Sequence, residues 1–365
     1  MTGLSDFFNR PINYLRLSVT DRCNLRCVYC MPLEGVAPLP HGEILSYEEI
    51  CLVARAASEL GISKVRLTGG EPLVRAHLSR LIGMLAGIEG IDDLSLTTNG
   101  VLLSRYAREL KAAGLKRVNI SLDSLHPERF GKITRIGKLE HSLQGIEAAR
   151  AAGLHPIKIN MVVMRGVNDD EIADFARLTM EKGWHVRFIE FMPIGEVKSR
   201  ETAVGSRQSA VWSGEGDYRL STMDYRQTPA PLYNGARLQT EEFVPISEII
   251  ERIESLGTLE PYSLDGNGPA RYFRLPQAKG TIGFISPVSE HFCFRCNRLR
   301  LTAEGKLRPC LLSDEEIDLR EPLRRRASVD ELKRLIEQAT QAKPEGHRLG
   351  SGTTARKRTM CQIGG

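Results

Sequence analysis

Three cysteines near the N-terminus have the spacing to hold a metal cluster. Cys23, Cys27 and Cys30 form a C-x3-C-x2-C group directly after a strand-like segment. Three closely spaced thiolates can bind three irons of a [4Fe–4S] cluster and leave the fourth iron without a protein ligand. Structural zinc is the alternative, but such sites have four protein ligands, and the only nearby candidate, Cys51, falls in a predicted helix. The group therefore favours an iron–sulfur cluster with one iron open to a cofactor or substrate.

A second group of cysteines repeats this arrangement near the C-terminus. It consists of Cys293, Cys296 and Cys310. Three thiolates again predict a cluster with one open iron. Zinc stays open as an alternative, because His291 could complete a tetrahedral site. Arg298 and Arg300 lie between the cysteines and point the same way on an extended segment. Solvated surface arginines are the usual explanation for such a pair, but here the neighbouring cluster argues for a ligand-binding role.

The overall composition limits the class of protein. The chain has 365 residues and is 41% hydrophobic, which is enough for one large α/β domain and a smaller one. Six of the eight cysteines fall in the two groups, which favours metal binding in a reducing compartment over a disulfide framework. A net charge of +5 is too small to indicate nucleic acid. Residues 1–10 lack the apolar stretch of a secretory signal, and no run is long enough to span a membrane, so we expect a cytoplasmic protein.

Short strand-like segments alternate with helical patterns in the first half of the chain. This predicts six βα units with parallel pairing. The strands are expected at Tyr14–Val19, Val65–Thr68, Leu94–Thr98, Arg117–Leu122, Ile157–Val163 and Val186–Phe191. Ser46 and Glu49 form a capping box at the start of the first helix, and four glycines mark helix ends. These are Gly61, Gly114, Gly153 and Gly183.

The predicted strands have one apolar and one polar face. In the first strand Leu15 and Leu17 oppose Arg16 and Ser18, and the other five strands alternate in the same way. The polar face includes Arg66, Lys158 and Arg187. Because a packed core does not tolerate such charges, we infer a barrel-like lumen that holds water and an anionic ligand. A half-exposed sheet with solvated charges is the alternative.

The remaining chain divides by its composition. We expect a partial barrel over residues 1–197 and an irregular surface insertion over 198–242, whose composition favours a disordered loop. Residues 243–342 carry the second cysteine group between two predicted helices, near Ile246–Leu256 and Val329–Ala342. Residues 343–365 are expected to form a flexible basic tail that ends in Gly-Gly.

The first cysteine group and a glycine-rich turn together resemble the radical S-adenosylmethionine superfamily. The superfamily motif is C-x3-C-x-aromatic-C, with Tyr29 as the aromatic residue, and residues 69–72 (GGEP) match its glycine-rich turn. The resemblance implies that the open iron binds the amino and carboxylate groups of S-adenosylmethionine. It also implies one-electron cleavage of this cofactor to a 5′-deoxyadenosyl radical, a reaction that belongs to the cofactors, while the protein orients them and excludes water.

The order of motifs along the chain resembles the GTP 3′,8-cyclase family more closely. The motifs are DRCNLRCVYCMP, TGGEP, SLDSL, RFIEFMPIG, CFRCNRLRLTAEGKLRPCL and the terminal GG. The resemblance implies an incomplete six-unit barrel of the radical S-adenosylmethionine type with a C-terminal extension that binds a second [4Fe–4S] cluster. It further implies GTP as substrate in the first step of molybdenum cofactor biosynthesis, an electron donor, and cyclic pyranopterin monophosphate synthase as the next enzyme. A homodimer is left open.

The same resemblance assigns roles to individual positions. Contacts to S-adenosylmethionine are implied for Tyr29, Gly70, Ser121 and Met192. Contacts to GTP are implied for Arg16, Arg66, Thr97, Lys158, Arg298 and Arg300, with Arg187 as a further candidate. Catalytic roles are implied for Arg298, Arg300, Gly364 and Gly365, because the family's terminal glycine pair reaches into the active site. Cys51 and Cys361 match no ligand position, and we interpret them as a packed core residue and a tail thiol.

Residues 198–241 form a longer insertion than the family norm, and the sequence does not show its role.

Two rival functions remain under consideration. A radical enzyme that acts on peptides is one rival, although such enzymes typically have more C-terminal cysteines. A non-catalytic electron carrier is the other, but the cationic strand faces would then have no purpose.

Overall fold

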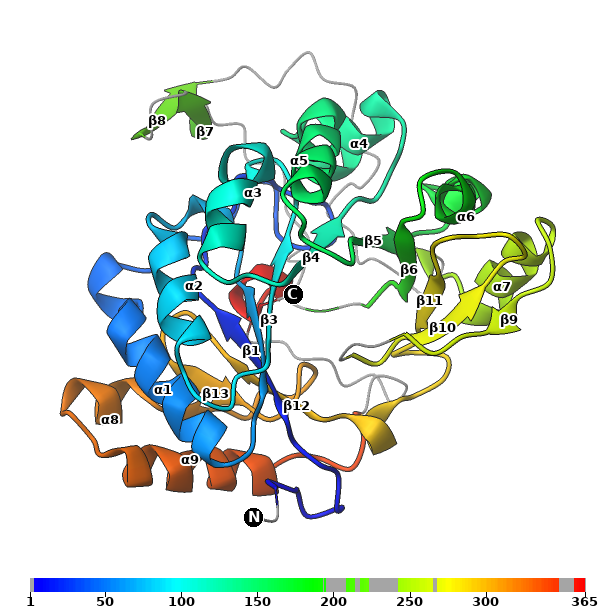
Figure 1. Ribbon diagram of the computed structural model, residues 1–365. Coiled ribbons are helices and arrows are strands. Elements are labelled where there is room, and N and C mark those ends of the chain that lie inside the picture. Colours follow the sequence, from blue (N-terminus) through cyan, green and yellow to red (C-terminus); the bar gives the residue numbers. More distant parts are fainter. Residues whose placement is uncertain are drawn as a thin grey trace, which may run out of the picture.

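Six parallel strands form the centre of one curved sheet of twelve strands (Figure 1). The computed structural model describes residues 3–192, 194, 208–213, 217–222, 242–264, 268–347 and 358–364. The central strands are β1 (Tyr14–Ser18), β2 (Lys64–Thr68), β3 (Asp93–Thr98), β4 (Arg117–Ser121), β5 (Lys158–Val163) and β6 (His185–Glu190). Each predicted strand is confirmed to within one residue at both ends.

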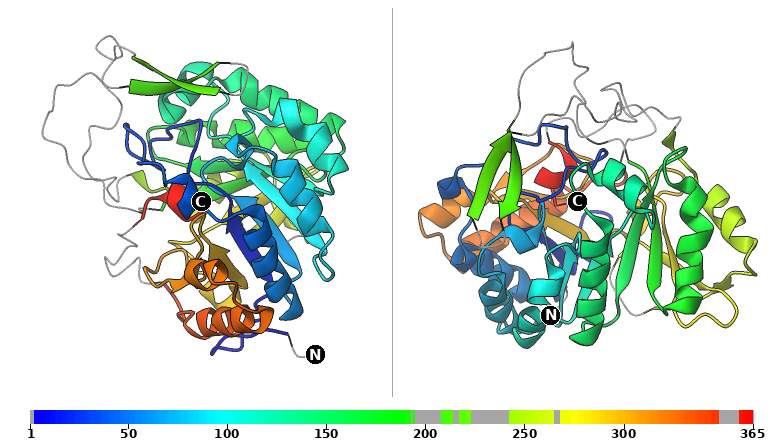
Figure 2. Two further views of the ribbon diagram at one scale, coloured as in Figure 1. Left: turned by 90° about the vertical axis from the view of Figure 1, so that its left-hand side faces the viewer. Right: turned by 90° about the horizontal axis from the view of Figure 1, so that it is seen from above.

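Helices between these strands cover the outer side of the curve (Figure 2). They are α1 (Tyr47–Glu59), α2 (Leu78–Ala86), α3 (Leu103–Ala112), α4 (Pro127–Thr134), α5 (Leu139–Ala151) and α6 (Ile172–Glu181). The predicted capping box of Ser46 and Glu49 is confirmed at the start of α1. The four glycines expected at helix ends all have a positive φ there, which confirms that they end the preceding helices. No helix in the described ranges is long and apolar enough to cross a membrane.

The apolar face of the central sheet is buried, and so are most cations of its polar face. The apolar face packs against the helices, and Leu15 and Leu17 are part of the largest core cluster. On the polar face Thr97, Ser121 and Asn160 are partly exposed, but Arg66 is only 5% exposed and Lys158 only 2% exposed. The alternative of a half-exposed sheet with solvated charges is therefore wrong. The buried cationic side chains lie on the inner face of the curved sheet, where the strand pattern predicts a lumen.

The C-terminal region extends this sheet at both edges. One edge continues from β1 through β12 (Arg298–Leu301), β13 (Lys306–Arg308) and β14 (Ile317–Asp318). The other edge continues from β6 through β11 (Ile282–Ile285), β10 (Arg271–Arg274) and β9 (Glu260–Pro261). Both β12 and β11 run parallel to the barrel strand that they pair with. The strand pattern did not predict this double extension, because it depends on pairing between distant segments.

The described part of the C-terminal region also contains α-helices. They are α7 (Ile246–Glu254), α8 (Arg320–Arg324) and α9 (Val329–Gln341). Helices α7 and α9 confirm the two helices that the sequence predicts in this region. Glu190 connects α7 to the barrel, because its buried carboxylate accepts hydrogen bonds from the amides of Ile246, Val288 and Ser289. These hydrogen bonds hold the start of the C-terminal region against the carboxyl end of β6.

Two segments differ from the expected irregular structure. The insertion contains a two-stranded antiparallel hairpin, formed by β7 (Gln208–Ser213) and β8 (Asp217–Thr222) (Figure 1). The rest of residues 198–241 lies outside the described residues. At the C-terminus, where we expected a flexible tail, residues 358–364 enter the interior and form the short helix η8 (Met360–Gln362) inside the curve of the sheet (Figure 2). Residues 348–357 are outside the described part of the chain.

Candidate active site between two cysteine groups

The first cysteine loop lies against the glycine-rich turn. Backbone hydrogen bonds join Gly70 N to Thr20 O at 2.7 Å and Glu71 N to Arg22 O at 2.8 Å. A Cβ atom on Gly70 would lie 2.2 Å from Arg22 O, so only glycine permits this approach of the two backbones. The turn therefore supports the chain just before Cys23, in addition to the cofactor contact that the resemblance implies.

Glu71 joins this turn to the loop after β3. Its carboxylate accepts hydrogen bonds from Thr98 Oγ1 at 2.7 Å and Asn99 N at 2.7 Å. Asn99 in turn donates to Asn24 Oδ1 in the cysteine loop at 2.8 Å. Burial raises the pKa of Glu71 to about 7, and these donors oppose the rise. The three loops at the carboxyl ends of β1, β2 and β3 thus form one hydrogen-bonded unit.

Substituting Gly70 with alanine is expected to displace the first cysteine loop. The clash with Arg22 O involves backbone, which cannot move aside without shifting the residues before Cys23. We expect the variant to lose about half of its bound iron, since one of two clusters is affected, and S-adenosylmethionine cleavage to fall at least about tenfold. Iron analysis and 5′-deoxyadenosine yield measure both effects.

Gly131→Ala is the matched control for this substitution. No atom lies within 4 Å of the added methyl group at this position in α4. The control is expected to keep full iron content and activity. Equal iron in Gly70→Ala and wild type would show that the turn does not support the cluster loop.

The first cysteine group is chemically suited to a cluster. Burial raises the pKa of Cys23 to about 12 and that of Cys27 well above the ordinary thiol value, and nearby arginines only partly oppose this. Such thiols ionise when a metal supplies the compensating charge. No three cysteine, histidine or acidic side chains in the described residues converge on a single-metal site. Three thiolates on one loop are the donor set that a [4Fe–4S] cluster with one open iron uses.

The candidate residues for S-adenosylmethionine gather at the carboxyl ends of the strands. Tyr29 donates a hydrogen bond to Asp123 Oδ2 at 2.8 Å, just beyond Ser121 at the end of β4. Met192 follows β6 and packs against the segment of Met360 and Ile363. Together with Gly70 after β2, these residues lie at the same end of the sheet as the first cysteine loop. Asp123 was not predicted, although it lies in the SLDSL motif.

The predicted GTP residues line the lumen on neighbouring strands. Arg16 on β1 is in register with Arg66 on β2 and with Arg300 on β12, so three guanidinium groups form one row. Burial lowers the pKa of Arg66, and it lowers that of Arg300 to about 9. Removing several like charges from water is costly, and an anionic ligand would offset this cost. The row therefore has the character of a site for a polyanion.

The other side of the lumen continues this pattern. Lys158 on β5 is in register with Asn119 on β4, and Thr97 on β3 pairs with the same asparagine. Arg187 donates hydrogen bonds to Asn119 Oδ1 at 2.7 Å and to Asn160 Oδ1 at 2.8 Å. Neutral amides hold this guanidinium in place without cancelling its charge. The structure thus brings Arg187 together with the other predicted cations.

The chain terminus reaches the arginine row. Gly364 O accepts hydrogen bonds from Arg16 Nη2 at 2.9 Å and from Arg300 Nη1 at 3.1 Å. Gly364 has a φ of +71°, and a Cβ there would meet Thr68 Cγ2 at 2.8 Å, so both conformation and space favour glycine. Gly365 lies outside the described residues.

The two remaining cysteines have different environments. Cys51 lies on α1 and packs against the main core, as predicted. Cys361 is only 2% exposed and interacts with Cys30, which raises the pKa of Cys30 and lowers the pKa of Cys361. Cys361 is therefore a buried neighbour of the first cysteine group, and the interpretation as a thiol on a mobile tail does not hold.

The second cysteine group assembles at the opposite end of the lumen. Cys296 precedes β12, and β13 runs antiparallel to β12, so the chain returns Cys310 to the same end. Burial opposes ionisation of the Cys296 thiol. The positive charges of Arg298 and Lys343 outweigh this effect and lower the pKa of the thiol to about 6. Arg298 Nη2 lies 3.7 Å from the Cys296 sulfur. An ionised thiolate at neutral pH is ready to bind a metal.

The zinc alternative for this group would need His291 as the fourth ligand. The described partners of the His291 ring are His347 Nε2 at 3.0 Å and Pro287 O at 3.2 Å, and no metal-binding triad forms among the described residues. Two cations that the sequence did not single out support the group. Arg10 donates to Cys293 O at 2.8 Å, and Lys343 donates to Arg298 O at 2.8 Å and Pro309 O at 2.7 Å. Only long-range packing brings these two residues to the site.

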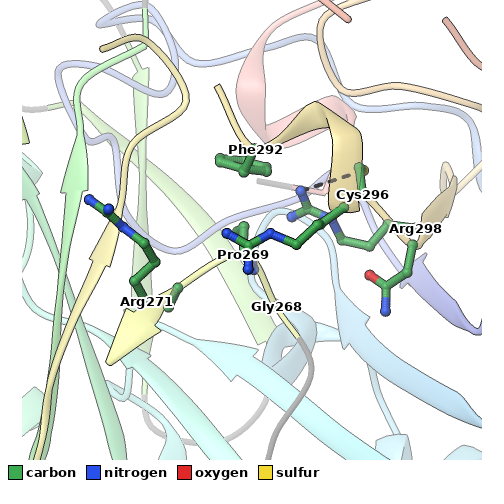
Figure 3. A pocket seen from close by; sticks show the side chains of 9 residues that line it. Gly268, Pro269, Arg271, Phe292, Cys296 and Arg298 are labelled. Carbon is green, nitrogen blue, oxygen red and sulfur yellow. Dashed lines mark hydrogen bonds between the residues drawn. The ribbon is translucent and has the colours of Figure 1, made fainter. Parts of the chain in front are cut away.

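A small pocket opens beside Cys296 (Figure 3). Arg271, from the start of β10, lies on one side, and Cys296 with Arg298 lies on the other. Phe292 borders the pocket, with the Arg298 guanidinium 5.2 Å from its ring centre. Because β10 and β12 belong to opposite edges of the sheet, the pocket lies where these edges approach. Arg271 and Phe292 were not predicted, since they belong to no recognised motif.

A partial β/α barrel with a three-cysteine loop after its first strand and a glycine turn after its second defines a radical S-adenosylmethionine protein. A family model described as "Radical SAM superfamily" matches residues 17–179, and one described as "Molybdenum Cofactor Synthesis C" matches residues 229–349. The chain belongs to the GTP 3′,8-cyclase family. It is 50% identical over 364 residues to the GTP 3′,8-cyclase of Pelotomaculum thermopropionicum, covering 99% of this chain and 100% of that protein.

Further relatives agree with this assignment. The GTP 3′,8-cyclase of Heliobacterium modesticaldum is 51% identical, with 99% of each chain covered. Among solved structures, Streptococcus suis SuiB aligns with a TM-score of 0.53 at 12% identity, covering 85% of this chain and 64% of that one. The likeness to SuiB concerns the fold alone, and it extends beyond the six-unit barrel.

Proposed function

We propose that this chain cyclises GTP to (8S)-3′,8-cyclo-7,8-dihydroguanosine 5′-triphosphate, the first step of molybdenum cofactor biosynthesis. The observation that carries the proposal is one buried cationic lumen with a cysteine triad at each end. The five-residue strand β1 spans ~17 Å between the two ends. A nucleotide triphosphate bound along the lumen would extend from one cysteine group toward the other. A peptide-modifying enzyme or an electron carrier does not need this row of arginines.

The first triad and its neighbours would hold the radical-generating cofactors. Cys23, Cys27 and Cys30 would bind the first [4Fe–4S] cluster, and Cys293, Cys296 and Cys310 would bind the second. When bound, the first cluster and S-adenosylmethionine supply the 5′-deoxyadenosyl radical that removes hydrogen from the substrate. Tyr29, Gly70, Ser121 and Met192 would orient the cofactor at the carboxyl ends of the strands. The packed segment of Met360 and Ile363 shields this end from water.

The protein's main contribution to cyclisation would be to hold GTP in one geometry. Arg16, Arg66 and Arg187 would bind the triphosphate oxygens, because a guanidinium group can donate two hydrogen bonds to them, and the Lys158 ammonium would add a further charge. Thr97 would add a hydroxyl donor on the same face. Arg298 would act next to the second cluster, Arg300 would act in the same row as Arg16 and Arg66, and Gly364 and Gly365 would complete the site from the chain terminus.

The wider context follows from the same proposal. The enzyme would need an electron donor for the first cluster and would pass its product to cyclic pyranopterin monophosphate synthase. We propose the cytoplasm as its location, because reduced thiols persist there. We also propose that a homodimer be tested as its oligomeric state. We also propose four parts: a radical S-adenosylmethionine barrel over 1–197, an insertion over 198–242, a cluster-binding region over 243–342 and a terminal segment over 343–365.

An anaerobic assay tests the function directly. The full-length protein is reconstituted with iron and sulfide, reduced, and given S-adenosylmethionine with GTP, ATP or no nucleotide. We expect GTP alone to be converted to a cyclised product with stoichiometric 5′-deoxyadenosine. Conversion of a peptide in place of GTP, or no cofactor cleavage at all, would support one of the two rivals.

The pH dependence of GTP affinity follows from Lys158. Burial lowers its pKa to about 7, and the neighbouring Arg187 and Arg117 act in the same direction. A bound triphosphate favours the charged Lys158 amine and raises its pKa. Lys158 therefore stays protonated in the complex at pH values where it is neutral in the free protein. The dissociation constant for GTP should therefore rise above pH 7, by up to about tenfold per pH unit. Equilibrium dialysis between pH 6 and 9 measures this effect.

Lys158→Arg is the matched control for this dependence. An arginine stays charged over the whole range and should flatten the profile above pH 7. Identical pH profiles for wild type and Lys158→Arg would show that Lys158 does not bind the triphosphate.

A further inference from the structure

A buried tyrosine at the start of β1 has a hydroxyl group with no partner among the described residues. Tyr14 is 2% exposed, and its hydroxyl oxygen makes no hydrogen bond to any residue that the structure describes. Buried hydroxyls are almost always paired, because an unpaired one loses its bonds to water without replacement. An exception therefore calls for an explanation, and a missing ligand is one.

The direction of the side chain is set by the strand. Tyr14 is two residues before Arg16, so both project to the lumen face of β1. Sheet register places Tyr14 between Arg298 on β12 and Lys64 on β2. The phenol ring is therefore part of the lumen wall, in the row next to that of Arg16, Arg66 and Arg300.

The groups around the phenol are cationic donors. The Arg66 guanidinium carbon lies 5.3 Å from the centre of the Tyr14 ring. The side chain is also within electrostatic range of Arg16, Arg298 and Arg300. Arginine and lysine side chains donate hydrogen bonds and accept none, so they leave the phenol proton without an acceptor. An anionic oxygen atom placed among these cations would accept from them and from the phenol together.

We propose that the Tyr14 hydroxyl donates a hydrogen bond to a phosphate oxygen of the bound nucleotide, which makes Tyr14 a binding residue for its triphosphate. This inference rests on the proposed function, because it takes the lumen as the nucleotide site. A phosphate oxygen fits better than the guanine ring, since the charges that flank the phenol are those of Lys64, Arg66 and Arg298. The phenol adds a neutral donor without adding to the repulsion among these cations.

Tyr14→Phe isolates the hydroxyl group. It keeps the ring and its contact with Arg66 and removes the one oxygen atom. We expect the dissociation constants for GTP and inorganic tripolyphosphate to rise about tenfold in the reconstituted protein, and that for guanosine to stay unchanged. The nucleotide-free variant should melt at the same temperature as wild type or higher, because a buried unpaired hydroxyl has been removed. A purely structural tyrosine would instead give a lower melting temperature and unchanged affinities.

Tyr47→Phe is the matched control. Tyr47 is also largely buried and also lies under an arginine, but its hydroxyl donates to Ala76 O at 2.7 Å, away from the lumen. This control should lower the melting temperature and leave GTP and tripolyphosphate binding unchanged.

The probes separate the inference from the proposed function. Unchanged tripolyphosphate affinity in Tyr14→Phe, or an equal loss for guanosine, would overturn the phosphate contact. Wild-type protein that binds tripolyphosphate but does not distinguish GTP from ATP would count against the proposed function. In that case a weaker affinity of Tyr14→Phe for tripolyphosphate would still support the Tyr14 contact.

Discussion

Substituting Cys27 with serine is expected to abolish S-adenosylmethionine cleavage while the second cluster stays in place. Cys27 is partly buried in the first cysteine loop, where a serine hydroxyl cannot replace a thiolate that binds iron. Bound iron should fall from about eight to about four atoms per chain, because one of two four-iron clusters is lost. Formation of 5′-deoxyadenosine should fall to background with or without GTP. Iron and sulfide analysis with product chromatography measures these effects.

Cys296→Ser gives the complementary result if the two clusters have separate roles. Its iron should also fall to about four atoms per chain. Cofactor cleavage should continue, but GTP should no longer be cyclised, because this thiolate borders the pocket at the far end of the lumen. Cys51→Ser is the control for cysteine loss, since Cys51 packs against the core on α1. Loss of all iron in both triad variants would contradict two independent clusters.

The sequence predicts the barrel well because its signals are local. Alternation of Leu15, Arg16 and Leu17 identifies both a strand and its lumen face, and the pattern recurs in each unit. Tyr14 carries the same signal, because it continues the alternation by one position. The capping box at Ser46 and the glycines at helix ends also act within a few residues. Such features depend little on the rest of the fold.

The parts that the sequence did not predict depend on long-range contacts. The register of Arg16 with Arg300 joins strands that are far apart in the chain, and no local pattern encodes that pairing. The burial of Cys361 beside Cys30 depends on the path of the terminal segment, whose composition alone suggests a mobile tail. Lys343 was assigned to the same tail, yet this residue is only 3% exposed at the second cysteine group. Composition describes a segment in isolation and cannot show which partner buries it.

Deleting Gly364 and Gly365 is expected to abolish GTP cyclisation and to preserve both clusters. The deletion removes the carbonyl that accepts hydrogen bonds from Arg16 and Arg300, so both guanidinium groups lose a fixed partner at the lumen. The fold should survive, because Arg358 binds the Glu316 carboxylate at 2.5 Å and 2.8 Å and anchors the segment upstream. We expect full iron content, cofactor cleavage that no longer yields product, and cyclisation at background.

A single substitution tests the same contact without creating a new terminal carboxylate near the arginines. Gly364→Ala keeps the chain length but places a methyl group 2.8 Å from Thr68 Cγ2, at a φ of +71° that disfavours alanine. Cyclisation should fall steeply in this variant, whereas Gly346→Ala, where nothing lies within 4 Å of the added methyl group, should keep wild-type turnover.

Normal turnover in the deletion variant would mean that the terminus only fills space. Lost iron would instead make it a structural support for the clusters. Retained iron with uncoupled cofactor cleavage would place the glycine carbonyl in the positioning of substrate, because only the step that needs GTP held beside the radical would then have failed.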